Sequence, residues 1–234
     1  FAVADEEAGG THGCKVLLEQ HWDHLHCDYV LTEFGGVPIN DSLLLTTAEK
    51  GVAWRRLHVG GTPGHGSMPY MTDNALVTAA EVIRRIDRYN PGPRLDRLWE
   101  QRVRAMGLGE DFTAQLMDPD RLYDALHILP PEIARNSHAC CHTTFSPTVI
   151  DGGVKTNVIP DHVAIDVDIR TLPGETTTDV ENHLRDALGD LYQRVRVEII
   201  IDEPASESAS KGRMWDALEG AMLEQYPRKE LVPS

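Results

Sequence analysis

The sequence predicts a mixed α/β chain in which a small domain is inserted into a larger one. Outside one charged stretch, residues 52–201 follow the order strand, helix, strand, strand, helix, strand, which is the split order of a ferredoxin-like domain. The segment before it follows the order strand, turn, helix, strand, with acids and glycines where the strands end, and such strand ends are where α/β sheets place ligands. The 234 residues suffice for one large domain or two smaller ones.

The first elements form the middle of the larger domain. Phe1–Ala4 is apolar and is expected to be a strand that Gly9-Gly10 breaks. Cys14–Trp22 has the spacing of a helix. Asp28–Thr32 is expected to be a short strand that ends on Glu33 and a pair of glycines.

The inserted domain is expected to begin near Lys50. Val52–Val59 has the composition of a strand, and the loop Gly60–Pro69 follows it. Asp73 is the expected N-cap of the next helix, which ends before Pro91. The apolar face of this helix is expected to consist of Leu76, Ala79, Ala80, Ile83 and Ile86.

A charged insertion of helical pattern, Arg94–Arg135, interrupts the inserted domain, and glycines and prolines divide it. Two strands follow, about Ala139–Thr148 and His162–Thr171, the second alternating cleanly between apolar and polar residues. A helix is then expected over Thr178–Leu191 and a strand over Val195–Ile201.

The chain after Pro204 returns to the larger domain, with one more helix expected over Lys211–Gln225. The expected boundaries are therefore 1–49 for the middle of the larger domain, 50–204 for the inserted domain and 205–234 for the return.

Charge and composition limit the partners. The formal net charge is −15, and phosphate backbones and anionic membranes require clustered Lys and Arg, so neither nucleic acid nor a membrane is an expected partner. The sequence contains neither a signal-peptide pattern nor an apolar run of roughly 20 residues. We therefore expect a cytoplasmic protein. Because the chain opens on Phe-Ala-Val-Ala without Met, we also expect that processing or truncation has removed what came before.

The four cysteines show no metal-binding or redox spacing. Because adjacent Cys140 and Cys141 would make a strained disulfide, free and mostly buried thiols are expected. Two histidine-containing strings, His21 to His26 and His138 to His142, look like metal ligands at first sight. The first lies at an expected helix end, where the helix dipole favours histidine, so we expect it on the solvated surface. The second lies on an expected strand, where neighbouring residues point to opposite faces, so we do not expect a single four-ligand site there.

Four short strings carry side chains suited to catalysis. Glu6 and Glu7 are adjacent carboxylates at a strand end, so one could bind a metal while the other accepts a proton. Read alone, such a pair also fits a helix N-terminus. Glu33 is another carboxylate before glycines. His65, flanked by glycines, is an imidazole exposed on a loop.

The fourth string runs from Gly152 to Pro160 and contains Asn157, and Arg170 follows inside an alternating strand. An Arg near the end of a sheet strand needs an anion or solvent. Each string is a weak signal alone, and their order and spacing make them specific.

Together the strings resemble the zinc peptidase and amidohydrolase family of aminoacylase, acetylornithine deacetylase, succinyl-diaminopimelate desuccinylase and glutamate carboxypeptidase. The resemblance runs through the chain outside the insertion, and Asp5-Glu6-Glu7 and Gly64-His65-Gly66-Ser67 are its most specific strings. It implies a partial zinc-peptidase catalytic domain with an inserted ferredoxin-like dimerisation (lid) domain.

The resemblance also implies the roles of six residues. The general base is Glu6, and the metal ligands are Glu7 and Glu33. His65 reaches the partner subunit's active site and holds the oxyanion, while Asn157 and Arg170 contact the substrate carbonyl and carboxylate.

The implied reaction is hydrolysis of an amide or peptide bond in an N-acyl amino acid or short peptide by a homodimer. Two zinc ions, or cobalt or manganese in their place, would activate a bridging water. The family carries further ligands before the acidic pair and near its C-terminus, so we expect a segment that lacks both ends of the catalytic domain. The alternative is a catalytically inactive fragment that acts only as a dimerisation module.

Overall fold

The computed structural model describes residues 2–5, 9–32 and 36–234, and it divides into two compact units, residues 1–35 and 36–234. In the first unit, helix α1 (Cys14–Leu25) confirms the helix expected over Cys14–Trp22. The Asp5 carboxylate accepts hydrogen bonds from the backbone N–H groups of His12 and Gly13, at 2.7 and 3.1 Å. An acid therefore stabilises the start of this helix, as the positive end of a helix dipole favours.

The prediction of two strands in the first unit is wrong for the residues that the structure describes. Residues 2–4 and 28–32 form no strand. An isolated extended segment leaves its backbone N–H and C=O groups unpaired, and neither segment has a partner strand in the described part of the unit. The expected strand end at Glu33 lies outside the described residues.

The second unit contains a small three-stranded sheet. Strands β1 (Val37–Ile39) and β2 (Ser42–Leu45) form a hairpin, and β12 (Glu230–Pro233) pairs with β2 in parallel. Helix α8 (Arg213–Gln225) precedes β12 and confirms the helix expected near the C-terminal end. A two-stranded ribbon of β3 (Ala48–Glu49) and β11 (Ser206–Glu207) then leads to the largest sheet.

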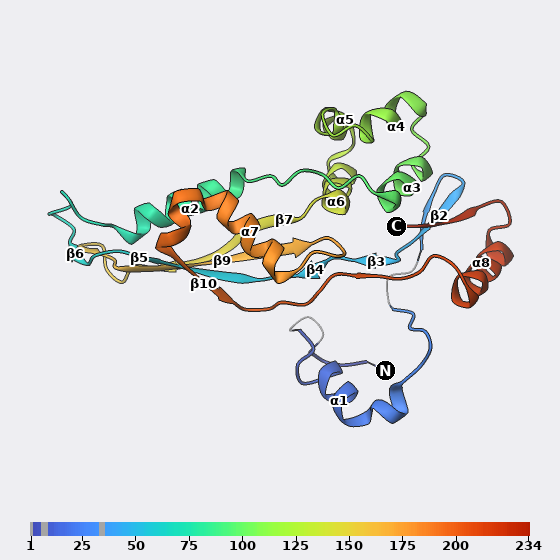
Figure 1. The fold of residues 1–234 in the computed structure, drawn as a ribbon, viewed down its shortest axis with the longest axis horizontal. Helices are drawn as coiled ribbons and strands as arrows, with labels where there is room; N and C mark the ends of the chain where they lie inside the picture. The colour runs from blue at the N-terminus through green and yellow to red at the C-terminus, as the bar shows by residue number, and fades with distance from the viewer. Residues whose placement is uncertain (1, 6–8, 33–35) are drawn as a thin grey trace. The chain divides into compact units, whose positions relative to one another are not determined.

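The largest sheet is antiparallel and has the strand order β10-β5-β9-β7. Its strands are β5 (Arg55–Gly60), β7 (Thr144–Gly152), β9 (His162–Thr171) and β10 (Val195–Ile199), and the short β4 (Gly51–Val52) continues the line of β5 along β9. With helices α2 (Ala75–Arg88) and α7 (Thr177–Leu188), this arrangement is the ferredoxin-like split β-α-β-β-α-β fold (Figure 1).

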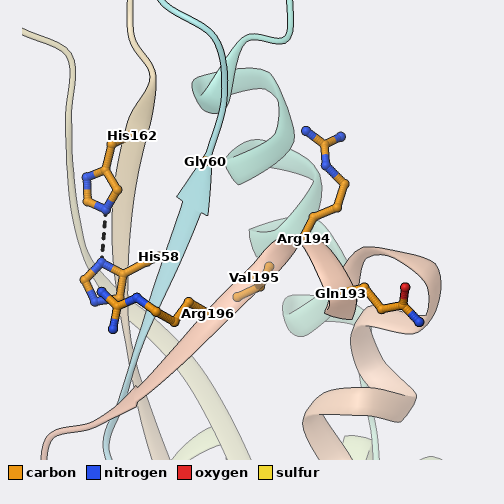
Figure 2. A pocket seen from close by; sticks show the side chains of 7 residues that line it. All are labelled: His58, Gly60, His162, Gln193, Arg194, Val195 and Arg196. Carbon is orange, nitrogen blue, oxygen red and sulfur yellow. Dashed lines mark hydrogen bonds between the residues drawn. The ribbon is translucent and has the colours of Figure 1, made fainter.

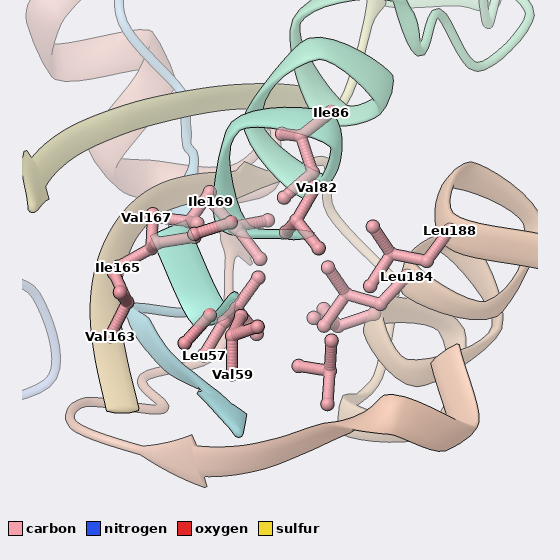
Figure 3. Close-up of a cluster of buried hydrophobic side chains, with 14 of the residues drawn as sticks. Leu57, Val59, Val82, Ile86, Val163, Ile165, Val167, Ile169, Leu184 and Leu188 are labelled. Carbon is pink, nitrogen blue, oxygen red and sulfur yellow. The ribbon is translucent and has the colours of Figure 1, made fainter. Parts of the chain in front are cut away.

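The core of this domain lies between one face of the sheet and its two helices (Figure 3). The alternation expected for β9 is confirmed, because every second residue of the strand is buried. Each such buried aliphatic side chain contributes roughly 1.5–3 kcal/mol. The buried aliphatic residues of β9 are Val163, Ile165, Val167 and Ile169, and they meet Val82, Ile86, Leu184 and Leu188 from the helices.

Two details of the expected helices need correction. The N-cap of α2 is Asn74, whose side-chain oxygen accepts from the Leu76 N–H at 3.0 Å, and not Asp73. Two residues of the expected apolar face, Leu76 and Ala80, are exposed. The buried side of the helix consists of Ala75, Ala79, Val82 and Ile86. Helix α7 ends at Leu188, where Gly189 takes a positive φ and a 3₁₀ turn over Gly189–Arg194 follows.

The charged insertion forms four helices, α3 (Arg97–Ala105), α4 (Glu110–Leu116), α5 (Leu122–Ile128) and α6 (Pro131–Cys141). They share a separate apolar core around Trp99, whose indole N–H donates to the buried Leu116 carbonyl at 2.9 Å. Since α6 runs to Cys141, the strand expected to begin at Ala139 begins at Thr144. The Lys50 ammonium donates to the carbonyls of Ala139 and His142, at 2.9 and 2.6 Å, and so stabilises this helix end.

The four cysteines are free, as expected, but only Cys141 is buried. None of the described helices is both long and apolar enough to cross a lipid bilayer.

Candidate functional site

The predicted catalytic and metal-binding carboxylates Glu6, Glu7 and Glu33 lie outside the described residues, and their roles stay predictions. His65, Asn157 and Arg170 are described.

His65 lies on a two-stranded ribbon at one end of the large sheet. Strand β6 (Gly64–His65) pairs antiparallel with β8 (Val158–Ile159), so that His65 lies opposite Val158. Its side chain is exposed, as expected for an imidazole on a glycine-flanked loop. The short ribbon itself has no sequence signal, because each strand contains only two residues.

The surrounding backbone fixes the tautomer of His65. Its Nδ1 accepts from the Ser67 N–H at 3.2 Å and lies 2.8 Å from the Ser67 hydroxyl. Because a backbone N–H can only donate, Nδ1 carries no proton in the neutral ring, and the proton is on Nε2. The free edge of the imidazole is therefore a hydrogen-bond donor, which suits it to hold a developing oxyanion.

Asn157 lies beside the His65 loop. The Gly66 N–H donates to the Asn157 carbonyl at 2.8 Å. A Cβ on Gly66 would approach the Asn157 backbone to 3.2 Å, tighter than most real contacts, so the approach of the two segments favours glycine at this position. The structure thus brings together two of the predicted site residues.

Arg170 lies on the solvent face of β9, held by a neighbour on its own strand. Asp168 accepts from its Nε at 2.7 Å and from one terminal nitrogen at 3.2 Å, and the Trp54 indole N–H donates to the same carboxylate at 3.0 Å. The guanidinium lies over the Trp54 ring at 5.8 Å. Asp168 was not among the predicted site residues, although its i, i+2 spacing from Arg170 on an alternating strand is a signal that could have identified it.

Strands β6 and β4 lie at opposite ends of the large sheet (Figure 1). His65 belongs to β6, and Arg170 is the cross-strand partner of Val52 in β4. Strand β8 directly precedes the His162 end of β9, and Gly60, before β6, pairs with His162. Arg170 is eight residues further along β9 (162 to 170), which at the usual rise per residue is roughly 26 Å. Asn157 therefore groups with His65 and not with Arg170.

A second group of polar side chains, which was not predicted from the sequence, lies beside the edge strand β10. His58 and His162 face each other across neighbouring strands, with 3.0 Å between Nδ1 and Nε2, and Glu198 lies 2.6 Å from Nε2 of His58. Figure 2 shows the two rings beside a cavity of about 380 Å³ that Arg194 and Arg196 also line. Since Glu198 only accepts, His58 donates to it and accepts from His162 when neutral.

Buried polar groups surround the end of α6. Burial lowers the pKa of Lys50 to about 8 and the pKa of His142 to about 4, the latter with the help of the neighbouring His138. The rings of His138 and His142 are stacked at 3.9 Å, and burial also lowers the pKa of His138. Both rings are thus neutral at pH 7. The thiol of Cys141 has its pKa raised to about 12 by burial, which makes it unreactive.

The described residues contain no group of three or more His, Cys, Asp or Glu side chains arranged to hold a metal ion. The histidines of the first unit, His21, His24 and His26, are exposed, as expected. The histidines near Cys141 lie at a helix end and not on the expected strand, and they form no such group either.

Comparison with known proteins identifies the family. The family described as peptidase dimerisation domain, of the M20 peptidases, matches residues 47–196. This chain belongs to that family, and its mixed α/β fold is that of the M20 peptidases.

Curated relatives extend the match beyond this domain. Probable carboxypeptidase S-like 2 of Dictyostelium discoideum is 26% identical over 98% of the chain and 46% of its own length. N-fatty-acyl-amino acid synthase/hydrolase PM20D1.1 of Danio rerio is 28% identical over 84% of the chain and 39% of its own length. The chain therefore spans less than half of these relatives.

Solved structures share the fold. Human carnosine dipeptidase 1 covers 97% of the chain with a TM-score of 0.63 and 14% identity, and the chain covers 52% of it. The M20 family metallo-carboxypeptidase Sso-CP2 of Sulfolobus solfataricus covers 96% with a TM-score of 0.62 and 15% identity, and the chain covers 62% of it. Both structures share their fold with this chain, and a sequence identity this low does not indicate a shared substrate.

Proposed function

We propose that this chain is part of a dimeric, metal-dependent hydrolase of the amide bond in N-acyl amino acids or short peptides with a free carboxylate. The hydrolase relatives support a peptide or acyl-amino acid substrate. The observation that carries the proposal is the separation of Arg170 from His65 and Asn157 along one sheet. Because roughly 26 Å of strand, from His162 to Arg170, separates the two ends of the sheet within one subunit, a site that uses these groups together takes them from two subunits.

In the proposed site Arg170 binds the substrate carboxylate. Asp168 occupies Nε and one terminal nitrogen of the guanidinium, so the other terminal nitrogen stays available for a planar, charge-assisted hydrogen bond. His65 of the second subunit donates from Nε2 to the oxyanion, a contact of the type worth about 3 kcal/mol. Asn157, which lies beside His65, reaches the same carbonyl from the second subunit.

Glu6 would hold the proton of the attacking water and pass it to the leaving amine. Glu7 and Glu33 are the proposed metal ligands, since carboxylate oxygens are among the ligands that zinc takes in proteins. Two zinc ions would supply a polarised carbonyl and a water of lowered pKa. We place the enzyme in the cytoplasm, which the four free cysteines support.

The surface proposed for the dimer consists of the edge strand β7 and the helix α2. Four large apolar side chains are exposed there, Leu76 and Val77 on α2 and Val149 and Ile150 on β7. In the described chain β7 pairs only with β9, so its outer edge is available to a second copy.

A mixed-dimer experiment tests the proposal. His65→Ala and Arg170→Ala are prepared separately in the full-length, metal-loaded enzyme, and each is expected to hydrolyse N-acyl amino acids poorly. After subunit exchange, half of the dimers are mixed, and each mixed dimer contains one site with both residues intact. Activity should recover to about a quarter of the wild-type value for such a C2 arrangement.

Native mass spectrometry verifies that the subunits have exchanged. If activity does not recover after this exchange, the result contradicts the action of His65 across the dimer. The alternative, a dimerisation module without catalysis, predicts that neither the wild type nor any mixture hydrolyses these substrates. The match of residues 47–196 to the dimerisation domain itself supports this alternative.

A further inference from the structure

The helical insertion carries an open cavity that the proposed function does not use. It lies between α5 and α6, has a volume of about 470 Å³ and is lined largely by apolar side chains, including Leu126, Leu129, Ala134 and Ala139. Its size falls in the range of small-molecule sites, roughly 300–1,000 Å³. The question is which part of a substrate could enter it.

The cavity borders Arg170 through one residue. Thr144, the first residue of β7, lines the cavity and is the cross-strand partner of Arg170. Directly opposed residues of an antiparallel pair have their Cα atoms about 4.5–5.5 Å apart, with side chains on the same face. The cavity therefore begins one strand away from the guanidinium.

The polar residues of the cavity are compatible with an apolar occupant. The Tyr123 hydroxyl is engaged by Nε2 of His142 at 2.7 Å, so its hydrogen-bonding capacity is used within the protein. The His138 ring is stacked on His142, and burial lowers its pKa, so it adds no charge at pH 7. Arg135 and His127 are exposed at the rim.

We propose that this cavity receives the apolar side chain of the substrate residue whose carboxylate Arg170 binds. In an α-amino acid one carbon carries both the carboxylate and the side chain, so a carboxylate held at Arg170 places the side chain within reach of Thr144 and the cavity. The acyl group lies on the far side of the scissile amide. This inference rests on the proposed function and adds its substrate class: leucine- or phenylalanine-like residues at the carboxylate end.

Hydrolysis of an N-acetyl series tests the proposal. The full-length, metal-loaded enzyme is assayed on N-acetyl derivatives of glycine, alanine, leucine and phenylalanine. We expect kcat/KM to rise at least tenfold from glycine to phenylalanine, the range for a few buried methylene groups. Ala134→Trp, which fills the cavity, should abolish most of this ratio, because the loss of kcat/KM falls on the substrates with large side chains.

Two further variants keep the result interpretable. Ala114→Trp changes an exposed alanine on α4 of the same insertion and should keep the wild-type ratio. Ala134→Leu should shift the ratio in the same direction as Ala134→Trp by a smaller factor, and it replaces that variant if tryptophan prevents folding. A wild-type ratio in both Ala134 variants would overturn the proposal while leaving the proposed function intact.

If no N-acyl amino acid is hydrolysed, the proposed function fails, and binding decides the role of the cavity. In calorimetric titrations the wild type should bind 3-phenylpropionate at least tenfold more tightly than propionate, and Ala134→Trp should bind the two equally. Equal affinity of the wild type for both acids would overturn the assignment.

Discussion

Single residues of the solvent face of β9 determine how the proposed site is oriented. Arg170 is the residue that we expect to contact substrate, and Asp168 is a positioning residue because it acts through the guanidinium. The adjacent pair on the same face, Arg56 and Asp166, has the same bidentate geometry at 2.6 and 2.8 Å. The sheet thus carries two similar ion pairs, of which only one lies at the expected substrate end.

We predict that Asp168→Asn raises KM for N-acyl amino acids about tenfold, as for a loss of about 1.4 kcal/mol, with kcat changed little. The reason is that a neutral amide holds the guanidinium less firmly, while the groups that act on the amide bond are unchanged. Asp166→Asn is the matched control and should leave KM unchanged. Steady-state kinetics on a substrate and on its C-terminal amide give the readout, since the amide should not respond to either variant. An equal response to both variants would indicate a structural role only.

At the scale of elements, the sequence predicts those parts of the fold whose signal is long and periodic. Strand β9 was predicted with its bounds because ten residues alternate, and α2 because its apolar spacing continues for three turns. The error at α6 has a tertiary cause: Pro130-Pro131 begins a helix whose far end is held by Lys50, a residue more than 80 positions earlier.

The candidate site, like the fold, was predicted from the sequence only in part. His65 was predicted from its glycines, and its exposure is confirmed. The proximity of Asn157 to His65 could not be predicted, because β6 and β8 each contain two residues and are defined by their pairing alone. The cavity between α5 and α6 depends on the packing of four short helices, for which a single sequence offers no spacing rule.

The end of α6 leads to a prediction about pH. His142 has a pKa of about 4 in the folded chain, against about 6.5 when it is exposed on unfolding. Between these values the unfolded chain binds a proton that the folded chain does not, so stability is complete above pH 6.5 and falls as the pH decreases toward 4. The difference corresponds to on the order of 3 kcal/mol.

Urea unfolding of the wild type and of His142→Gln at pH 7, 5.5 and 4 measures this effect. The free energy of unfolding of the wild type should fall more steeply than that of the variant, which keeps hydrogen-bonding groups but does not titrate. His127→Gln, which removes an exposed histidine of the neighbouring helix, should follow the wild type. Parallel curves for the wild type and His142→Gln would show that the buried ring does not control acid stability.

At the scale of the whole molecule, the large sheet has two free edges in the described chain, β7 and β10. An unpaired edge invites pairing with another chain unless charges or irregular residues protect it. Strand β10 carries Arg196, which lines the cavity of His58 (Figure 2), and Glu198, which lies 2.6 Å from His58. The end of β7 carries the exposed apolar side chains of Val149 and Ile150. Gly153, directly after β7, lies next to α2, since a Cβ on it would be 3.9 Å from Leu76.

We therefore predict that Ile150→Asp converts the proposed dimer to a monomer, because it places a charge in the apolar surface of β7 and α2. The matched control is Ile199→Asp on β10, since both isoleucines are 53% exposed and both lie on edge strands. Sedimentation velocity at micromolar concentration should give a monomer for the first variant and a dimer for the second. Activity should be lost with the dimer, because each site then lacks His65 of its partner. The reverse pattern would assign the interface to β10, and two intact dimers would remove both edges from consideration.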